Sequence, residues 1–242
     1  MRGKCGLVRV GRAGLCLFER GCCGCESALC LGEGVLGELL LLVARRPLWL
    51  ILLREESARF AANRNHVSGR IVETEAYVVG DAAAHSFIGV TPRNRSLFLE
   101  RGHAYVYFIY GAWFCLNVSG EREGVGGGVL LRAVEPFEGV GLMLGRRPGA
   151  PPHKLASGPG RLATAFGIGR RHDGVDLCAP GPLWLGAPYR RWAPPSIGES
   201  VRIGITREAH RQLRFFERGS PCVSGPKWLQ GEGATDRRRA RA

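Results

Sequence analysis

The clearest pattern of hydrophobic and polar positions in the chain is an alternation that runs from Arg70 to Tyr77. Residues two apart in a β-strand point to the same face of the sheet, so the alternation predicts a strand. One face is expected to carry Ile71, Glu73, Glu75 and Tyr77, and the other Val72, Thr74 and Ala76. Two carboxylates and an aromatic ring would therefore point the same way.

Two further segments, residues 104–110 and 113–119, are rich in aromatic and β-branched side chains. Only a Gly-Ala pair separates them, which predicts a β-hairpin with a tight tip. The tyrosines of the first segment are Tyr105, Tyr107 and Tyr110. Taken alone, these tyrosines are more typical of a sheet core than of a binding surface.

Shorter patterns predict the remaining elements. Strands are expected at residues 48–54, 129–134, 183–185, 200–206 and 213–217, and helices at 35–44, 138–146 and 161–168. Residues 80–95 contain the Gly, Pro, Asn and Asp residues of a long ordered loop, a type of segment that often carries function. The 36 glycines and 14 prolines favour many turns and few long helices, which argues against a helix bundle.

The length of the chain, 242 residues, allows one sizeable core and predicts a single folded domain. We expect this domain at residues 35–225, after an irregular Gly/Cys-rich leader at 1–34 and before a basic, disordered tail at 226–242. Six of the nine cysteines fall in the leader, unlike the cysteines of a secreted disulfide framework. Cys22 and Cys25 have C-x-x-C spacing, but no second pair with a plausible zinc loop follows them.

Neither a secretory signal nor a membrane-spanning segment is predicted. The basic residues at 1–4 are not followed by a continuous apolar core. The apolar residues 39–53 are interrupted by Arg45, Arg46 and Pro47, and this segment is too short and too charged to span a bilayer. We therefore expect a protein that is not secreted and has no membrane partner.

The formal net charge is +13, with 34 basic residues against 21 acidic ones. Such a balance favours a polyanionic partner, of which nucleic acid is the leading candidate. The alternative is a protein with a high isoelectric point from an arginine-rich proteome, because 31 of the 34 basic residues are Arg.

Several polar residues could take part in chemistry. A strand-borne Glu beside a Tyr can act as a general base, because a desolvated carboxylate has a raised pKa. The alternative is an exposed strand face with Glu73 and Glu75 in solvent. His85 alone is more typical of a structural histidine. Arg93 and Arg95 fit a solvated loop, or, with Asn94 between them, a phosphate-binding loop.

Lysines are few in the part of the chain that carries the candidate chemistry. The chain has only Lys4, Lys154 and Lys227, and none lies between residue 70 and His153. A Schiff-base mechanism through a lysine is therefore hard to build unless Lys154 folds inward. No HExxH motif, no H-x-E motif with paired cysteines and no P-loop occurs, and the sequence predicts no metal and no cofactor.

Five blocks of sequence, taken together, resemble the alkyladenine DNA glycosylase family, also called 3-methyladenine or methylpurine DNA glycosylase. The blocks are Arg70–Tyr77, Thr91–Arg95, Tyr105–Gly111, Cys115–Asn117 and Leu130–Pro136, and two more follow in order at Ser157–Leu162 and Arg218–Pro221. The resemblance covers residues 68–225, about two thirds of the chain.

The resemblance implies a monofunctional enzyme of base-excision DNA repair. Such an enzyme flips an alkylated or deaminated purine out of duplex DNA and hydrolyses its N-glycosidic bond with a Glu-activated water, leaving an abasic site. By the match, Glu75 is the general base and Arg132 positions the water. The roles implied for the other residues are base binding for Tyr77, His85, Tyr107 and Asn117, intercalation into the duplex for Tyr110, and DNA-backbone contacts for Arg93 and Arg95.

The implied fold is a single α+β domain with a curved, mainly antiparallel β-sheet, short flanking helices and a protruding β-hairpin that enters the minor groove. The implied partner is double-stranded DNA that contains damaged purines, bound by a monomer. The expected location is the cytoplasm or nucleoid in a bacterium and the nucleus in a eukaryote.

Parts of the sequence depart from the family pattern. Ala112 stands at the hairpin tip where a larger apolar residue is common, and Phe87–Val90 replaces a more polar segment. Two rival interpretations remain open. One is a basic nucleic-acid-binding protein of the same fold without glycosylase activity, and the other is a structural protein whose tyrosines all belong to the core.

Overall fold

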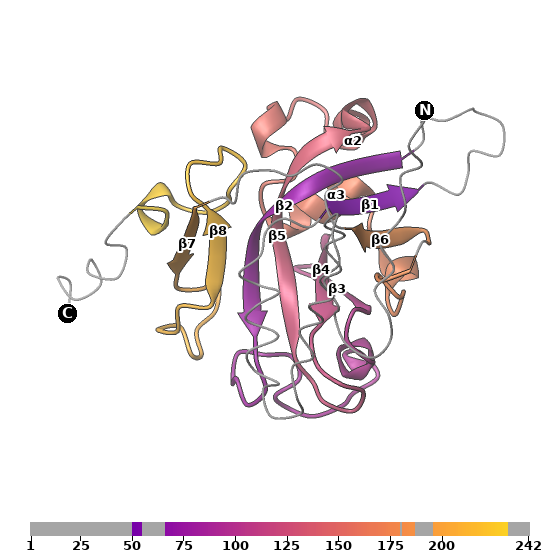
Figure 1. Ribbon diagram of the computed structural model, residues 1–242, viewed down its shortest axis with the longest axis vertical. Helices are drawn as coiled ribbons and strands as arrows, with labels where there is room; N and C mark the ends of the chain where they lie inside the picture. The colour runs from indigo at the N-terminus through magenta and orange to yellow at the C-terminus, as the bar shows by residue number, and fades with distance from the viewer. Residues whose placement is uncertain (1–49, 55–65, 180, 187–195, 232–242) are drawn as a thin grey trace, which may run out of the picture.

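The computed structural model describes residues 50–54, 66–179, 181–186 and 196–231 (Figure 1). It contains one β-sheet flanked by short helices, and every strand pairing in it is antiparallel. The strands are β1 (Leu50–Arg54), β2 (His66–Tyr77), β3 (Ala104–Ile109), β4 (Trp113–Ser119), β5 (Gly128–Glu138), β6 (Leu183–Gly186), β7 (Ile197–Ser200) and β8 (Arg214–Glu217). The helices are α2 (Val140–Arg146) and α3 (Pro159–Phe166), with 3₁₀ turns η1 (Arg95–Phe98), η2 (Pro152–Lys154), η3 (Arg170–His172) and η4 (Lys227–Leu229). The prediction of a mainly antiparallel α+β domain is confirmed.

Strand β2 is the centre of the sheet. The main path of the sheet is β3-β4-β5-β2-β1-β6, and β8, with β7 beyond it, joins β2 separately. One edge of β2 pairs with β5, while the other pairs with β1 near its start and with β8 from Glu73 to Glu75. The second half of β2 therefore has a neighbouring strand on each side. Both of its carboxylates are buried.

The pairing of β2 with β5 is interrupted by register shifts on both sides of Glu73. Ile71 pairs with Val134, Glu73 pairs with Ala133 and Thr74 pairs with Leu131, so that Val72 and Arg132 are left without a partner in the register. Such bulges change the direction in which the neighbouring side chains point. The prediction that Ile71 shares a face with Glu73 and Glu75 is wrong, because Ile71 packs in the main apolar cluster together with Ala76.

The main apolar core lies between the sheet and the helix α3. Val106 of β3 and Leu116 of β4 pack there with Leu162 and Phe166 of α3. Pro159 begins the helix, where its missing N–H costs nothing, and Gly167 ends it with a left-handed φ of +70°. A separate cluster of Leu97, Tyr105, Tyr107, Cys115 and Leu130 occupies the other face of β3, β4 and β5. The alternation of β3 thus divides core residues from the residues that face the candidate site.

Most of the other predicted elements are present. The strands predicted at 129–134, 183–185 and 213–217 correspond to β5, β6 and β8, and the helices at 138–146 and 161–168 correspond to α2 and α3. The strand predicted at 48–54 corresponds to β1, whereas the helix predicted at 35–44 lies outside the described residues.

The strand predicted at 200–206 is wrong beyond Ser200, where β7 ends. The Ile203 N–H donates to a Glu75 carboxylate oxygen rather than to a neighbouring strand, and Gly204 has a φ of +80°. A backbone that hydrogen-bonds to side chains in this way cannot continue a β-ladder.

The ends of the predicted domain stay predictions. The leader at 1–34, with Cys22 and Cys25, and residues 232–242 lie outside the described part of the chain. Residues 226–231 are described: η4 lies there, Leu229 is buried, and its carbonyl accepts a hydrogen bond from Arg214.

Candidate active site

One cavity of about 770 Å³ brings together most of the predicted site residues. The predicted residues that line it are Tyr77, His85, Tyr107, Tyr110, Asn117 and Arg132. They come from the end of β2, the loop that follows, the β3–β4 pair and β5. The cavity is also lined by Ile203 and by the start of α3. Glu75, Arg93 and Arg95 do not line it, although the three residues bonded to Glu75, which are Tyr77, Arg132 and Ile203, do.

The aromatic wall of the cavity is built by three rings in mutual contact. The Tyr105 and Tyr107 rings stack with centroids 5.2 Å apart, because residues two apart on β3 share a face. The His85 ring lies edge-on to the Tyr107 ring, with the ring centroids 4.6 Å apart. Its Nδ1 lies 2.9 Å from the Tyr105 hydroxyl. Burial, with Arg93 adding to it, lowers the pKa of His85, which favours the neutral imidazole. Burial raises the pKa of Tyr105 to about 12.

Tyr105 was not predicted as a site residue, and the structure places it in the cavity wall. Its spacing of two from Tyr107 in a predicted strand is the signal that identifies it.

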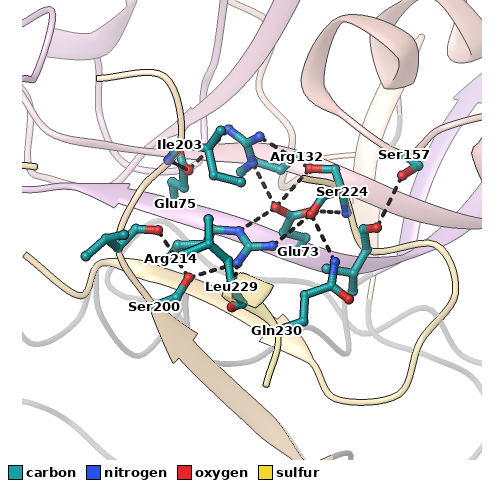
Figure 2. Close-up of polar contacts among 12 residues, drawn as sticks. Glu73, Glu75, Arg132, Ser157, Ser200, Ile203, Arg214, Ser224, Leu229 and Gln230 are labelled. Atoms are coloured by element: carbon teal, nitrogen blue, oxygen red, sulfur yellow. Dashed lines mark hydrogen bonds and ion pairs between the residues drawn. The ribbon is translucent and has the colours of Figure 1, made fainter. Parts of the chain in front are cut away.

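Glu75 is fully buried beside the cavity (Figure 2). Its Oε1 accepts a hydrogen bond of 2.7 Å from the Ile203 N–H and lies 3.1 Å from Arg132 Nη1. Its Oε2 accepts one hydrogen bond of 3.0 Å, from the Tyr77 hydroxyl. Burial raises the pKa of Glu75 above its usual value, and Arg132 and the Ile203 N–H oppose this shift. Oε2 retains a lone pair that a water molecule can use.

Glu73, two residues earlier on β2, accepts more hydrogen bonds than Glu75, and most of them reach one oxygen. Its Oε1 lies 2.8 Å from Arg132 Nε, 2.7 Å from Arg214 Nε and 3.0 Å from Ser224 Oγ, all of which donate to it. Its Oε2 accepts the Ser224 N–H at 2.6 Å. Figure 2 shows these bonds converging on one carboxylate. Glu73 therefore holds the two guanidinium groups in place.

Arg132 connects the two carboxylates. Its Nε binds Glu73 and its Nη1 faces Glu75, while the guanidinium also reaches Ser224 Oγ at 3.3 Å. Burial alone would lower the pKa of Arg132, but Glu75 and Glu73 outweigh burial and raise it. Arg132 is thus a fixed cation in the wall of the cavity.

Sequence reasoning missed Arg214 and Ser224. Arg214 is completely buried on β8, where it also donates to Ser200 Oγ and to the Ser224 carbonyl. A charged residue beside the phenylalanines of a short apolar strand was the available signal for Arg214. Nothing local in the sequence distinguishes Ser224.

The loop that carries Arg93 and Arg95 is held internally by Asn94. Asn94 Nδ2 donates to the carbonyls of His85 at 2.8 Å and Gly89 at 2.9 Å, and its Oδ1 accepts the Thr91 N–H at 2.6 Å. Asn94 is buried, and its side chain holds the loop together from within. Arg93 is exposed and donates to the Phe108 carbonyl on β3 at 3.0 Å.

The connection between β3 and β4 exposes its aromatic residue. Tyr110 is 82% exposed and has a positive φ of 53°, followed by Gly111 with a φ of 67°. A non-glycine residue in this conformation is uncommon and occurs mainly in tight turns. Asn117, deeper in the cavity, has an amide nitrogen without a hydrogen-bond partner among the described residues.

Within the described ranges, no cluster of three or more His, Cys, Asp or Glu side chains could hold a metal ion. No helix in this part of the chain is long and apolar enough to cross a membrane.

Comparison with known proteins agrees with this geometry. The sequence pattern of the family described as methylpurine-DNA glycosylase matches residues 52–221. A protein of Mesorhizobium japonicum named "Putative 3-methyladenine DNA glycosylase" is 61% identical over 164 residues, which cover 68% of this chain and 78% of the relative. Proteins with the same printed name from Paraburkholderia phytofirmans and Methanoculleus marisnigri are 55% and 45% identical, over 67% and 75% of this chain and 76% and 92% of their own lengths. The chain belongs to the methylpurine-DNA glycosylase family.

Proposed function

We propose that this protein excises alkylated or deaminated purines from duplex DNA by hydrolysis of the N-glycosidic bond. The observation that carries the proposal is a buried carboxylate, Glu75, whose bonded partners Tyr77, Arg132 and Ile203 line an aromatic cavity. The family and the printed names of the relatives support the same reaction class.

The cavity accepts a purine that has left the base stack. A base inside the duplex cannot be reached, so the nucleotide must be extruded at a cost of a few kcal/mol. The Tyr77 and Tyr107 rings hold the flipped base between them, with His85 at its edge, and stacking contributes about 1–3 kcal/mol per base. A cationic alkylated purine gains further from these electron-rich rings. The exposed Tyr110 fills the vacancy in the duplex.

Hydrolysis requires a water placed at the sugar carbon. Glu75 Oε2 accepts only the Tyr77 hydroxyl among the described groups, and its remaining lone pair takes the proton of that water. Arg132, held in place by Glu73, orients the water from the other side. The negative charge of Glu75 also stabilises the oxocarbenium-like sugar as the bond breaks.

Base specificity and DNA-backbone binding are assigned to residues farther from the sugar. The role proposed for Asn117 is to exclude purines with a guanine-type amino group, and it is supported by its place in the cavity lining and by its amide nitrogen, which has no partner among the described residues. Arg93 and Arg95 contact the DNA backbone, consistent with the net charge of +13.

The reaction stops at the abasic site. A lyase step would need an amine near the sugar, and neither Lys154 nor Lys227 lines the cavity. A monofunctional hydrolase therefore fits the described residues, and it binds its DNA as a monomer.

The experiment that tests this proposal is the release of 3-methyladenine from methylated duplex DNA. The purified protein is expected to release the base, and Glu75→Gln to reduce release by about 10²–10⁴-fold, the usual contribution of a general base. Binding of Glu75→Gln to a duplex with an abasic-site analogue should stay intact. Equal activity of the mutant and the wild type would refute the role of Glu75, and DNA binding without any release would favour a binding protein of the same fold.

A further inference from the structure

The loop after β2 presents an apolar surface that the proposed reaction does not use. Phe87, Ile88 and Val90, called here the apolar loop tip, are 51%, 75% and 63% exposed. Adjacent exposed apolar side chains of this size often mark an interaction site. The three residues fall in the segment where the sequence departs from the more polar family pattern.

The exposure of the tip is built into the loop rather than left by a loose segment. The Phe87 N–H donates to the Ala84 carbonyl at 3.1 Å, and the Gly89 N–H donates to the Ser86 carbonyl at 3.0 Å. Asn94 Nδ2 holds the Gly89 carbonyl from inside, and Gly89 has the positive φ of 81° that the turn needs. The fold thus fixes three apolar side chains in solvent.

The tip lies at the rim of the cavity. His85 and Ser86, directly before it, line the cavity, and Arg93, shortly after it, donates to the Phe108 carbonyl on the strand that leads to Tyr110. The apolar loop tip and the β3–β4 tip therefore belong to one connected surface around the cavity mouth. In Figure 1 the loop follows the arrowhead of β2 at the lower end of the domain.

We propose that the apolar loop tip packs into the minor groove of the substrate DNA, against nucleotides next to the flipped one. This inference rests on the proposed function. Minor-groove proteins often place apolar side chains against the sugars and base edges there and open the groove with them. The exposed Arg93 and the net charge of +13 favour a polyanion over an apolar protein partner. Two contacts, Tyr110 and Ile88, would then hold the duplex on two sides of the extruded nucleotide.

The test measures binding of a duplex that contains a tetrahydrofuran abasic-site analogue. Ile88→Gln is expected to weaken this binding by about tenfold, the effect of withholding one aliphatic side chain from an apolar contact. Phe87→Gln should weaken it similarly. The slope of log K against log salt should stay unchanged, because the contact neutralises no phosphate, whereas Arg93→Gln should lower that slope by about one.

The matched control is Phe137→Gln. Phe137 is 40% exposed, but it lies near the end of β5, five residues beyond Arg132, the last residue of that strand that lines the cavity. Five residues of strand span about 17 Å. Phe137→Gln should bind the duplex as the wild type does, and neither tip variant should bind a single-stranded analogue more weakly.

Three outcomes decide the proposal. Wild-type affinity of Ile88→Gln and Phe87→Gln for the duplex would overturn it. A wild type that is dimeric without DNA, with a monomeric Ile88→Gln variant, would also overturn it, because the tip would then cover a second copy. If the wild type binds the duplex through the tip yet releases no 3-methyladenine, the loop contact stands and the proposed function fails.

Discussion

Glu73 and Glu75 lie two residues apart on β2, and both are fully buried, yet their surroundings differ in kind. Glu73 accepts four hydrogen bonds, from two guanidinium groups and from Ser224, within a region of completed polar contacts. Glu75 keeps a lone pair on Oε2, and its partners form the wall of the cavity. Burial therefore does not distinguish the two carboxylates. Glu75, the proposed general base, is the one whose bonded partners all line the cavity, whereas Arg214, a partner of Glu73, does not.

The same contrast extends to the rest of the site. Behind the cavity, Arg214 donates hydrogen bonds to Glu73, Ser200 and Ser224 and so holds these residues in place. At the cavity, Asn117 has an unpaired amide nitrogen and Tyr110 an exposed ring. A buried polar group without a partner costs free energy, so its retention at the cavity fits a group that pairs with a ligand. Mutation of the residues behind the cavity, Glu73 and Arg214, should therefore change mainly stability. Mutation of the residues at the cavity, such as Asn117 and Tyr110, should change mainly ligand binding.

The largest expected effect is on the stability of Glu73→Gln. The substitution leaves the buried Arg214 without its carboxylate and Arg132 with Glu75 alone, and breaking a buried pair in this way costs about 3–5 kcal/mol of unfolding free energy. Urea denaturation followed by tryptophan fluorescence measures this loss. Glu75→Gln is the matched control and should lose about half as much or less, because its buried charge is already disfavoured by desolvation. Equal losses would mean that both carboxylates are structural.

Tyr110→Ala, unlike Glu73→Gln, should weaken DNA binding and leave stability almost unchanged. The ring is 82% exposed, so the free energy of unfolding should change by less than about 0.5 kcal/mol. Binding to duplex DNA with an abasic-site analogue should weaken by about tenfold or more, since the ring no longer stacks in the vacancy. Tyr110→Phe, which keeps the ring, should bind as the wild type does. Tight binding by Tyr110→Ala would exclude the intercalating role.

Much of the fold follows from local patterns in the sequence. The alternation from Arg70 to Tyr77 predicts β2, two aromatic segments predict β3 and β4, and the pattern at 161–168 predicts α3, which in the structure runs from Pro159 to Phe166. These signals are local because each element needs one buried face and recognisable ends. The grouping of Tyr77, Tyr107 and Asn117 around one cavity required the resemblance to a family, since nothing in their spacing fixes how the strands pair.

What the sequence did not predict depends on long-range contacts. The bulges around Glu73 move Ile71 into the main core, and they arise from the pairing with β5, about 60 residues later. Arg214 and Ser224 reach Glu73 across 141 and 151 residues. The strand predicted beyond Ser200 fails because Ile203 bonds to Glu75. Local propensity contains no information about such partners.

The pH dependence of Tyr77→Phe sharpens the assignment of Glu75. The Tyr77 hydroxyl lowers the pKa of Glu75, so its removal raises that pKa further. The reaction needs the ionised carboxylate, so the single-turnover rate falls as the pH drops through the pKa of Glu75. In Tyr77→Phe this pKa is higher. The fall in rate at low pH, the acid limb of the profile, should therefore move to higher pH. At neutral pH the rate should fall by about three- to tenfold, the effect of one hydrogen bond.

The control for this pH shift is Tyr105→Phe. The Tyr105 hydroxyl lies beside His85 rather than Glu75, so its removal should leave the acid limb in place. An acid limb that does not move in Tyr77→Phe would place the titrating group elsewhere than Glu75.

The smallest expected effect is that of Asn117→Ser, and it concerns selectivity rather than rate. The amide nitrogen of Asn117 already lacks a partner among the described residues, so its removal should change the unfolding free energy by less than about 1 kcal/mol. The shorter side chain leaves space for a purine amino group, and the kcat/KM ratio of 7-methylguanine to hypoxanthine should rise by about two- to fivefold. Competition between duplexes with the two bases measures this ratio directly. An unchanged ratio with intact stability would show that the unpaired amide takes no part in selection, and the contrast between the two regions would then rest on Glu75 and Tyr110 alone.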